Sequence, residues 1–87
     1  MAFRIETATR GTVTVVILSG RVDQRAIAEL ETLFERQADY PNIVLDLKDV
    51  SVVDREVVRF FVHCEADGVR LENCASYMRG WMEREKD

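Results

Sequence analysis

The chain has 87 residues and a net charge of −4, which fits one small domain over residues 1–87 with a thin core. Acidic and basic residues are interspersed along it, so the surface is not suited to neutralising phosphates and we expect no nucleic acid partner. No apolar run approaches the ~20 residues of a membrane span, and no basic and apolar leader opens the chain, so we expect a soluble, cytoplasmic protein without membrane insertion.

The first half of the sequence predicts a hairpin followed by a helix. Segments 3–7 and 12–19 have the alternation of strands, and Arg10-Gly11 between them is typical of a hairpin turn. Apolar residues then recur at helical spacing over residues 24–38, and Asp23 is placed to accept hydrogen bonds from the first free amides of this helix.

The second half alternates strands and helices, with Tyr40-Pro41 separating it from the first helix. The expected elements are a strand over 42–47, a helix from Asp54 to about Ala66, a strand over 69–73, and a last helix from Cys74 after an Asn73 cap. The order β-β-α-β-α-β-α calls for right-handed crossovers. It predicts an α/β fold with a four-stranded, mostly parallel sheet whose first strand is antiparallel.

The alternation of apolar and polar residues along the strands predicts which face of the sheet is buried. The apolar set comprises Phe3, Ile5, Val13, Val15, Ile17, Ile43, Leu45, Leu47, Val69 and Leu71. Because the alternate positions are mostly polar, all three helices should pack on one face and leave the other open. Val16, Leu18 and Val44 fall on the open face in this assignment, either as scattered surface residues or as a patch for a second copy.

The helix faces follow from the same kind of pattern. On the second helix the buried side should comprise Val57, Phe60, Phe61 and Cys64, and the outer side Arg59, His63 and Asp67. On the last helix, Tyr77 and Trp81 could form an exposed aromatic surface or complete the core, and we assign them to the core.

Few residues suggest a catalytic, metal-binding or redox site. Cys64 and Cys74 are too few for a disulfide scaffold, and a single histidine without a Cys-x-x-Cys pair gives no zinc spacing. The sequence has no Gly-rich phosphate loop or nucleophile elbow, and Asp46 falls in mid-strand without the acidic pair of a phosphoreceiver. We expect no enzyme, no cofactor, no metal and two reduced thiols.

Three segments, in this order and at this spacing, resemble the STAS domain: ILSGRVD from Ile17, IVLDLKDVSVVD from Ile43, and GVRLENCASYMRGWM from Gly68. The resemblance covers about Phe3 to Met82. STAS domains occur in bacterial anti-sigma-factor antagonists and in the cytoplasmic part of sulphate transporters. The resemblance implies a sheet covered by helices on one face, in agreement with the strand pattern, and a role in binding other proteins.

The resemblance also implies a binding edge over residues 49–56. In STAS antagonists the third strand leads to an Asp-Ser/Thr-x-Gly sequence at the start of the second helix, and a partner kinase phosphorylates the hydroxyl. The corresponding residues here are Asp54-Arg55-Glu56-Val57, so the aspartate matches but the hydroxyl and the glycine do not. A guanidinium can neither take a phosphate by that chemistry nor imitate one, so we expect the phospho-switch to be lost.

The candidate partner-binding residues are Asp49, Ser51, Asp54, Arg55 and Glu56. Asp54 also suits a helix cap, and Glu56 suits the helix dipole. Arg55 opposes that dipole, so it has no evident duty within its own fold and is the leading candidate for an intermolecular contact.

Together these features predict a non-catalytic interaction module with a protein partner, such as a kinase-type anti-sigma factor or a related regulator. Two alternatives stay open: a STAS-like domain that binds a small molecule or lipid, and a homodimer through the open sheet face. A ligand carrier should have a sizeable apolar cavity between helices and sheet, whereas a partner module should have a flat surface around Arg55.

Overall fold

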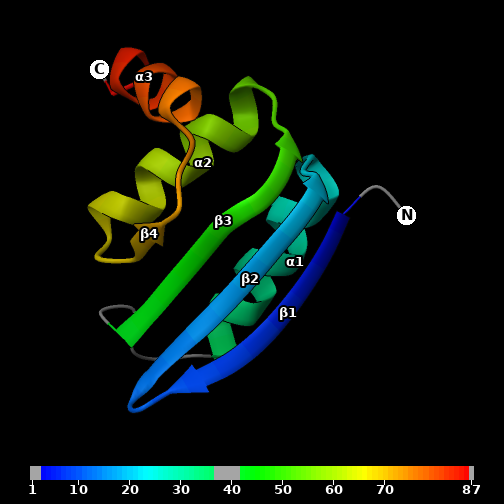
Figure 1. Ribbon diagram of the computed structural model, residues 1–87, viewed down its shortest axis with the longest axis vertical. Coiled ribbons are helices and arrows are strands. Elements are labelled where there is room, and N and C mark those ends of the chain that lie inside the picture. The colour runs from blue at the N-terminus through cyan, green and yellow to red at the C-terminus, as the bar shows by residue number, and fades with distance from the viewer. Residues whose placement is uncertain (1–2, 37–41, 87) are drawn as a thin grey trace.

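The computed structural model describes residues 3–36 and 42–86. The elements are β1 (Phe3–Arg10), β2 (Val13–Arg21), α1 (Gln24–Arg36), β3 (Ile43–Val52), α2 (Arg55–Ala66), β4 (Arg70–Glu72) and α3 (Ser76–Arg84), as Figure 1 shows. The strands form one sheet in the order β1-β2-β3-β4, in which β1 is antiparallel to β2 and the other pairs are parallel. The predicted fold class is confirmed.

Two of the helices begin at predicted caps. The Asp23 carboxylate accepts a hydrogen bond of 3.0 Å from the Arg25 amide at the start of α1, and Asp54 Oδ1 accepts one of 3.0 Å from the Val57 amide of α2. Each such cap contributes about 1 kcal/mol. The predicted end of the first helix, at Ala38 and Tyr40-Pro41, lies outside the described residues.

The predicted start of the last helix is wrong. The helix α3 begins at Ser76, and Ala75 before it makes no side-chain cap. Asn73 instead adopts a left-handed backbone with φ 57°, and its Nδ2 donates a hydrogen bond of 3.0 Å to Asp46 Oδ1. That bond, followed by one from the Lys48 amide, lowers the pKa of Asp46. Asn73 therefore ties the end of β4 to β3 rather than capping a helix.

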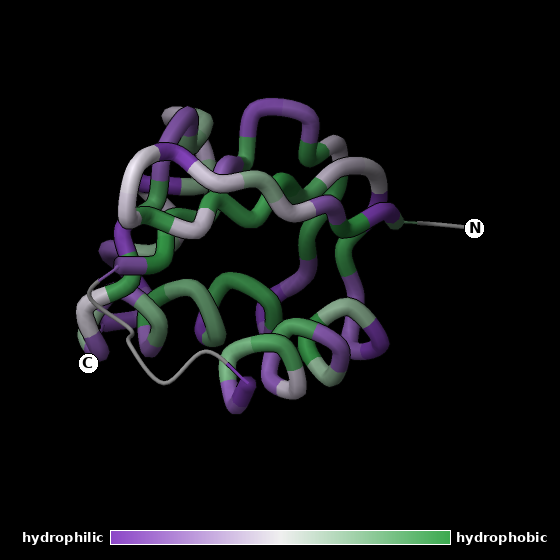
Figure 2. Tube along the Cα trace, turned by 90° about the horizontal axis from the view of Figure 1, so that it is seen from below, coloured by the Kyte–Doolittle hydropathy of each residue, from purple (hydrophilic) through white to green (hydrophobic). Residues whose placement is uncertain are grey.

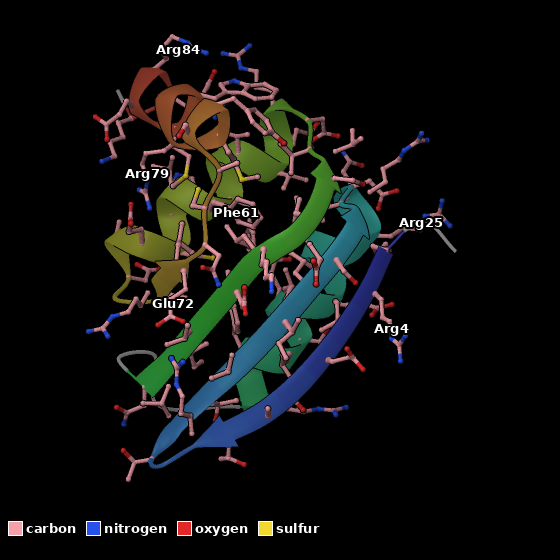
Figure 3. All side chains as sticks on the ribbon, viewed as in Figure 1. Arg4, Arg25, Phe61, Glu72, Arg79 and Arg84 are labelled. Atoms are coloured by element: carbon pink, nitrogen blue, oxygen red, sulfur yellow. The ribbon has the colours of Figure 1, made fainter. Side chains whose placement is uncertain are left out.

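The helices α1 and α2 form a layer on one side of the sheet (Figure 2), and α3 packs against α2. Between the layers lies a core that includes Leu30, Phe34, Ile43, Leu45, Leu47, Val57, Val58, Phe61, Met78 and Met82. Phe61 lies between α2 and β3 in Figure 3 and is fully buried. Within the described residues no helix is long and apolar enough to cross a membrane.

The prediction for β2 placed its two faces the wrong way round. Val16 and Leu18 are fully buried in the core, where Val16 pairs with Leu45 of β3 and Leu18 pairs with Ile5 of β1. The segment from Val13 to Leu18 carries apolar residues on both sides, so an alternation of period two does not choose between them. Pairing with the neighbouring strands made that choice.

The open face of the sheet is apolar at its centre and charged around it. The centre consists of Val13, Val15, Ile17 and Val44. Arg10 of β1 and Glu72 of β4 form an ion pair of 2.9 Å, although β2 and β3 separate their strands. These two side chains therefore reach across the open face. Val15 and Val44 beneath them are only 8% and 4% exposed, which leaves a second copy little apolar surface to bind.

The helix faces agree with the pattern except at three residues. On α2, Val57, Phe61 and Cys64 are buried as predicted, but Val58 is also buried and Phe60 is only half-buried. On α3, Met78 and Met82 occupy the buried side, which turns Tyr77 outward to 55% exposure, so its assignment to the core was wrong. Trp81 packs against the core at its margin.

The register of β2 predicts unequal effects of two neighbouring substitutions. Leu18→Ala should lower the free energy of unfolding by about 2–5 kcal/mol, because it leaves a cavity beneath the helices. Ile17→Ala, the matched change on the open face, should cost about 1 kcal/mol. Urea unfolding followed by circular dichroism measures both losses. Equal losses would contradict the assignment of Leu18 and Ile17 to opposite faces.

The burial of Cys64 predicts an unreactive thiol. Burial, followed by the charges of Asp67 and Glu31, raises the pKa of Cys64 to about 12. At pH 8 roughly one Cys64 in 10,000 would then be ionised, so labelling should be very slow in the native protein. In a Cys74→Ala variant, a chromogenic disulfide reagent should report no reaction until denaturant is added. Rapid labelling of that variant would show that α2 does not pack as described.

Candidate functional site

The candidate site is the end of β3 and the first turn of α2, residues 49–56, which we call the β3–α2 edge. The sequence predicted a loop after Leu47, but β3 continues to Val52. Asp49 pairs with Ser19 of β2, and irregularities in the register on both sides break the regular alternation. That break explains why a period-two pattern ended the strand too early.

The structure brings all five predicted residues together at this edge, and all five are exposed. Asp49 and Ser51 lie on β3, whereas Asp54, Arg55 and Glu56 lie at the start of α2. One further residue was missed. Val52, the last residue of β3, is 49% exposed and adds an apolar side chain to an otherwise charged surface. Three valines within four residues at the end of a strand were a signal that one of them would face outward.

Asp54 has the structural role that its position suggested. Its Oδ1 accepts the hydrogen bond from the Val57 amide, which supplies one of the four free amides at the start of α2 with a partner. A negative charge at this place also suits the positive end of the helix dipole. The cap holds the first turn of α2 in position directly after β3.

Arg55 has an intramolecular partner, which contradicts the expectation that it had no duty in its own fold. Its Nε lies 3.3 Å from Oε1 of Glu85, just beyond the end of α3, and Arg59 Nε lies 3.9 Å from the same oxygen. The Arg55 side chain is still 69% exposed. An exposed pair of this kind contributes about 0–1 kcal/mol, so it orients the guanidinium more than it stabilises the fold.

Glu56 connects the β3–α2 edge to α1. Gln24, the first residue of α1, donates a hydrogen bond from Nε2 to Glu56 Oε2. Glu56 also lines a hollow between α1 and α2 together with Ile27 and Phe60. The edge is therefore continuous with the seam between these two helices.

A hollow of about 450 Å³ lies between β1 and α1, outside the β3–α2 edge. Its lining includes Ile5 and Leu33, but also the charged side chains of Glu29 and Arg36. The space beneath the helices is filled by core side chains such as Leu30 and Phe61, which are fully buried. The hollow thus opens at the β1 edge of the sheet rather than within the core.

The thiols and the histidine differ in their exposure to solvent. Both cysteines are free, with Cys64 buried and Cys74 half-buried, and burial raises the pKa of each thiol. His63 is exposed on α2, as its place on the polar helical face indicated. Within the described residues, no three His, Cys, Asp or Glu side chains come together as a group that could hold a metal ion.

Comparison with protein families agrees with this architecture. The sequence model of the STAS domain matches residues 4–72, which run from β1 to the end of β4 and include the whole β3–α2 edge. No curated protein matches the chain, so the family model alone carries the assignment. The match covers most of the sequence, and the mixed four-stranded sheet with the order β-β-α-β-α-β-α fits it. The chain belongs to the STAS domain family.

Proposed function

We propose that this STAS domain is a non-catalytic, cytoplasmic interaction module that binds a protein partner through the β3–α2 edge. The observation that carries the proposal is Arg55. It stands at the position where STAS antagonists have their phosphorylated hydroxyl, it is 69% exposed, and its ion pair with Glu85 holds it in place. Arginine is enriched among the residues that dominate binding energy at interfaces. The neighbouring Val52 offers apolar surface to the same partner.

The proposed module works without a phospho-switch. Phosphorylation would add nearly two negative charges at a contact surface, whereas Arg55 keeps a permanent positive charge there. Ser51 is the only hydroxyl within residues 49–56, and it lies on β3 before the cap residue Asp54. We therefore infer constitutive binding, with a kinase-type anti-sigma factor or a related regulator as the kind of partner and with no role for nucleic acid.

Two alternative functions have less support from the geometry. A homodimer through the open sheet face would have to displace the Arg10–Glu72 pair, which lies over Val15 and Val44. A carrier of a small molecule or lipid would use the hollow beside β1. That hollow is of ligand size, but Glu29 and Arg36 contribute to its lining, which an apolar ligand would not favour.

Reversal of the charge at Arg55 tests the proposal. Arg55→Glu should abolish capture of the partner from the native host, because it places a carboxylate between Asp54 and Glu56. The free energy of unfolding, followed by thermal unfolding, should change by no more than about 1 kcal/mol, since the lost ion pair is exposed. Quantitative mass spectrometry of pull-downs, with the wild type as reference, measures the loss.

Two controls separate binding from structure. Arg36→Glu makes the same charge change on α1, away from the edge, and should retain the partner. Glu85→Gln removes the ion pair but keeps the guanidinium of Arg55, so it should weaken capture of the partner far less than Arg55→Glu does. Unchanged capture by Arg55→Glu would refute the β3–α2 edge as the binding surface.

The absence of a switch is tested separately. Incubation with an anti-sigma-type serine kinase and ATP should leave the intact mass of the protein unchanged, because the accepting hydroxyl is replaced by Arg55. A STAS antagonist that retains the whole Asp-Ser/Thr-x-Gly sequence serves as the positive control for kinase activity. Stoichiometric phosphate on Ser51 of the wild type would contradict constitutive binding.

A further inference from the structure

A groove follows the seam between α1 and α2 and begins next to the β3–α2 edge. It consists of two hollows of about 350 and 430 Å³ that share Phe60 and His63 in their linings. One hollow includes Ile27 and Glu56, and the other extends to the end of α2 at Asp67. We call the two together the α1–α2 groove.

The floor of the groove is aromatic. The rings of Phe34 and Phe60 stack with their centroids 6.3 Å apart and their planes at 8°. Cys64, which is 5% exposed, lies in the same lining. Phe34 is only 4% exposed, whereas Phe60 is half-buried and lines both hollows, so Phe60 supplies the accessible part of this aromatic surface.

Three carboxylates surround that floor: Glu31 and Glu35, one turn apart on α1, and Asp67 after the end of α2. Among the described residues none of the three forms an ion pair with a lysine or arginine, and none of those cations lines this hollow. Like charges four residues apart destabilise a helix by a few tenths of a kcal/mol. The arrangement is thus a small cost to the free protein.

The negative field of these groups reaches the floor of the groove. Asp67 and Glu31 both add to the effect of burial in raising the pKa of the Cys64 thiol. Arg59 lies in the neighbouring hollow, but its guanidinium is directed to Glu85 at 3.9 Å. An incoming cation would therefore find carboxylates that no lysine or arginine among residues 3–36 and 42–86 already pairs with.

We propose that the α1–α2 groove binds a basic segment of the partner protein, with an arginine or lysine side chain placed against the accessible part of the Phe60 ring among Glu31, Glu35 and Asp67. The inference rests on the proposed function, because it assigns a chemistry to the partner that the module binds. Cations favour aromatic faces, and the charge-assisted bonds of a guanidinium to carboxylates are stronger than neutral ones. The adjoining hollow beside Ile27 suits an apolar neighbour in the same segment.

A pair of peptides tests the groove directly. The probe is acetyl-Leu-Arg-Leu-Arg-amide, and its control carries citrulline, which has the shape of arginine without the charge. In nitrogen-15 NMR spectra of the full chain, the arginine peptide should cause saturable shifts that centre on residues 31–35 and 60–67. The affinity of the citrulline peptide should be lower by at least about tenfold, which is a loss of about 1.4 kcal/mol of binding free energy or more.

Two triple variants distinguish binding in the groove from general attraction to the negative charge of the protein. Glu31→Gln with Glu35→Gln and Asp67→Asn should weaken binding of the arginine peptide about tenfold. The matched control, Glu6→Gln with Glu29→Gln and Glu83→Gln, makes the same change in net charge at exposed positions outside the groove and should retain the wild-type affinity. Thermal unfolding should show that both variants fold, with the groove variant no less stable than the wild type.

Several outcomes would contradict the proposal that the groove binds a basic segment. Equal weakening in both triple variants would mean general attraction to an acidic protein, and equal binding of argininamide alone would mean a small cation rather than a protein segment. Shifts confined to residues 49–56 would also overturn the groove, while leaving the proposed function intact. Conversely, peptide binding in the groove together with unchanged partner capture by Arg55→Glu would refute the β3–α2 edge alone.

Discussion

The parallel pairing of β2 with β3 is the constraint on which the rest of the structure depends. It sets Val16 beside Leu45 and so turns one side of β2, including Leu18, toward the helices. A shift by one residue would exchange the two faces of the strand and expose the core. The same pairing extends to Asp49 and Val52, so it also fixes where β3 ends and where α2 can begin. The position of the candidate site is therefore a consequence of sheet register.

The β3–α2 edge combines a rigid base with accessible side chains. The Asp54 cap holds the first turn of α2, and two contacts then connect that turn to the other helices: Arg55 with Glu85 beyond α3, and Glu56 with Gln24 of α1. Further along α2, Glu65 receives two hydrogen bonds from Arg79 of α3 at 2.9 and 3.0 Å. Side chains that are already oriented lose less conformational freedom on binding, which favours a role in recognition.

Charge is distributed in two different ways over the surface. On the open sheet face opposite charges are paired, as in Arg10 with Glu72, and the valines beneath them are covered. In the α1–α2 groove the carboxylates pair with no lysine or arginine of the described residues, and the Phe60 ring in the floor is partly accessible. The ion pair on the sheet face covers its apolar centre, whereas carboxylates of one sign beside an accessible aromatic ring attract a partner of the opposite sign. This contrast favours the groove over the sheet face as an interaction surface.

Local signals in the sequence determined the order of the elements, the cap at Asp54, most of the buried side of α2 and the segments that resemble the STAS domain. These depend on residues within a few turns of one another. The faces of β2 depend on pairing with β1 and β3, because both sides of its apolar run were equally able to enter the core. The partner of Arg55 is 30 residues away, and the exposure of Tyr77 depends on how α3 meets α2. Only the tertiary structure decided these features, because each is a contact between segments that local periodicity does not relate.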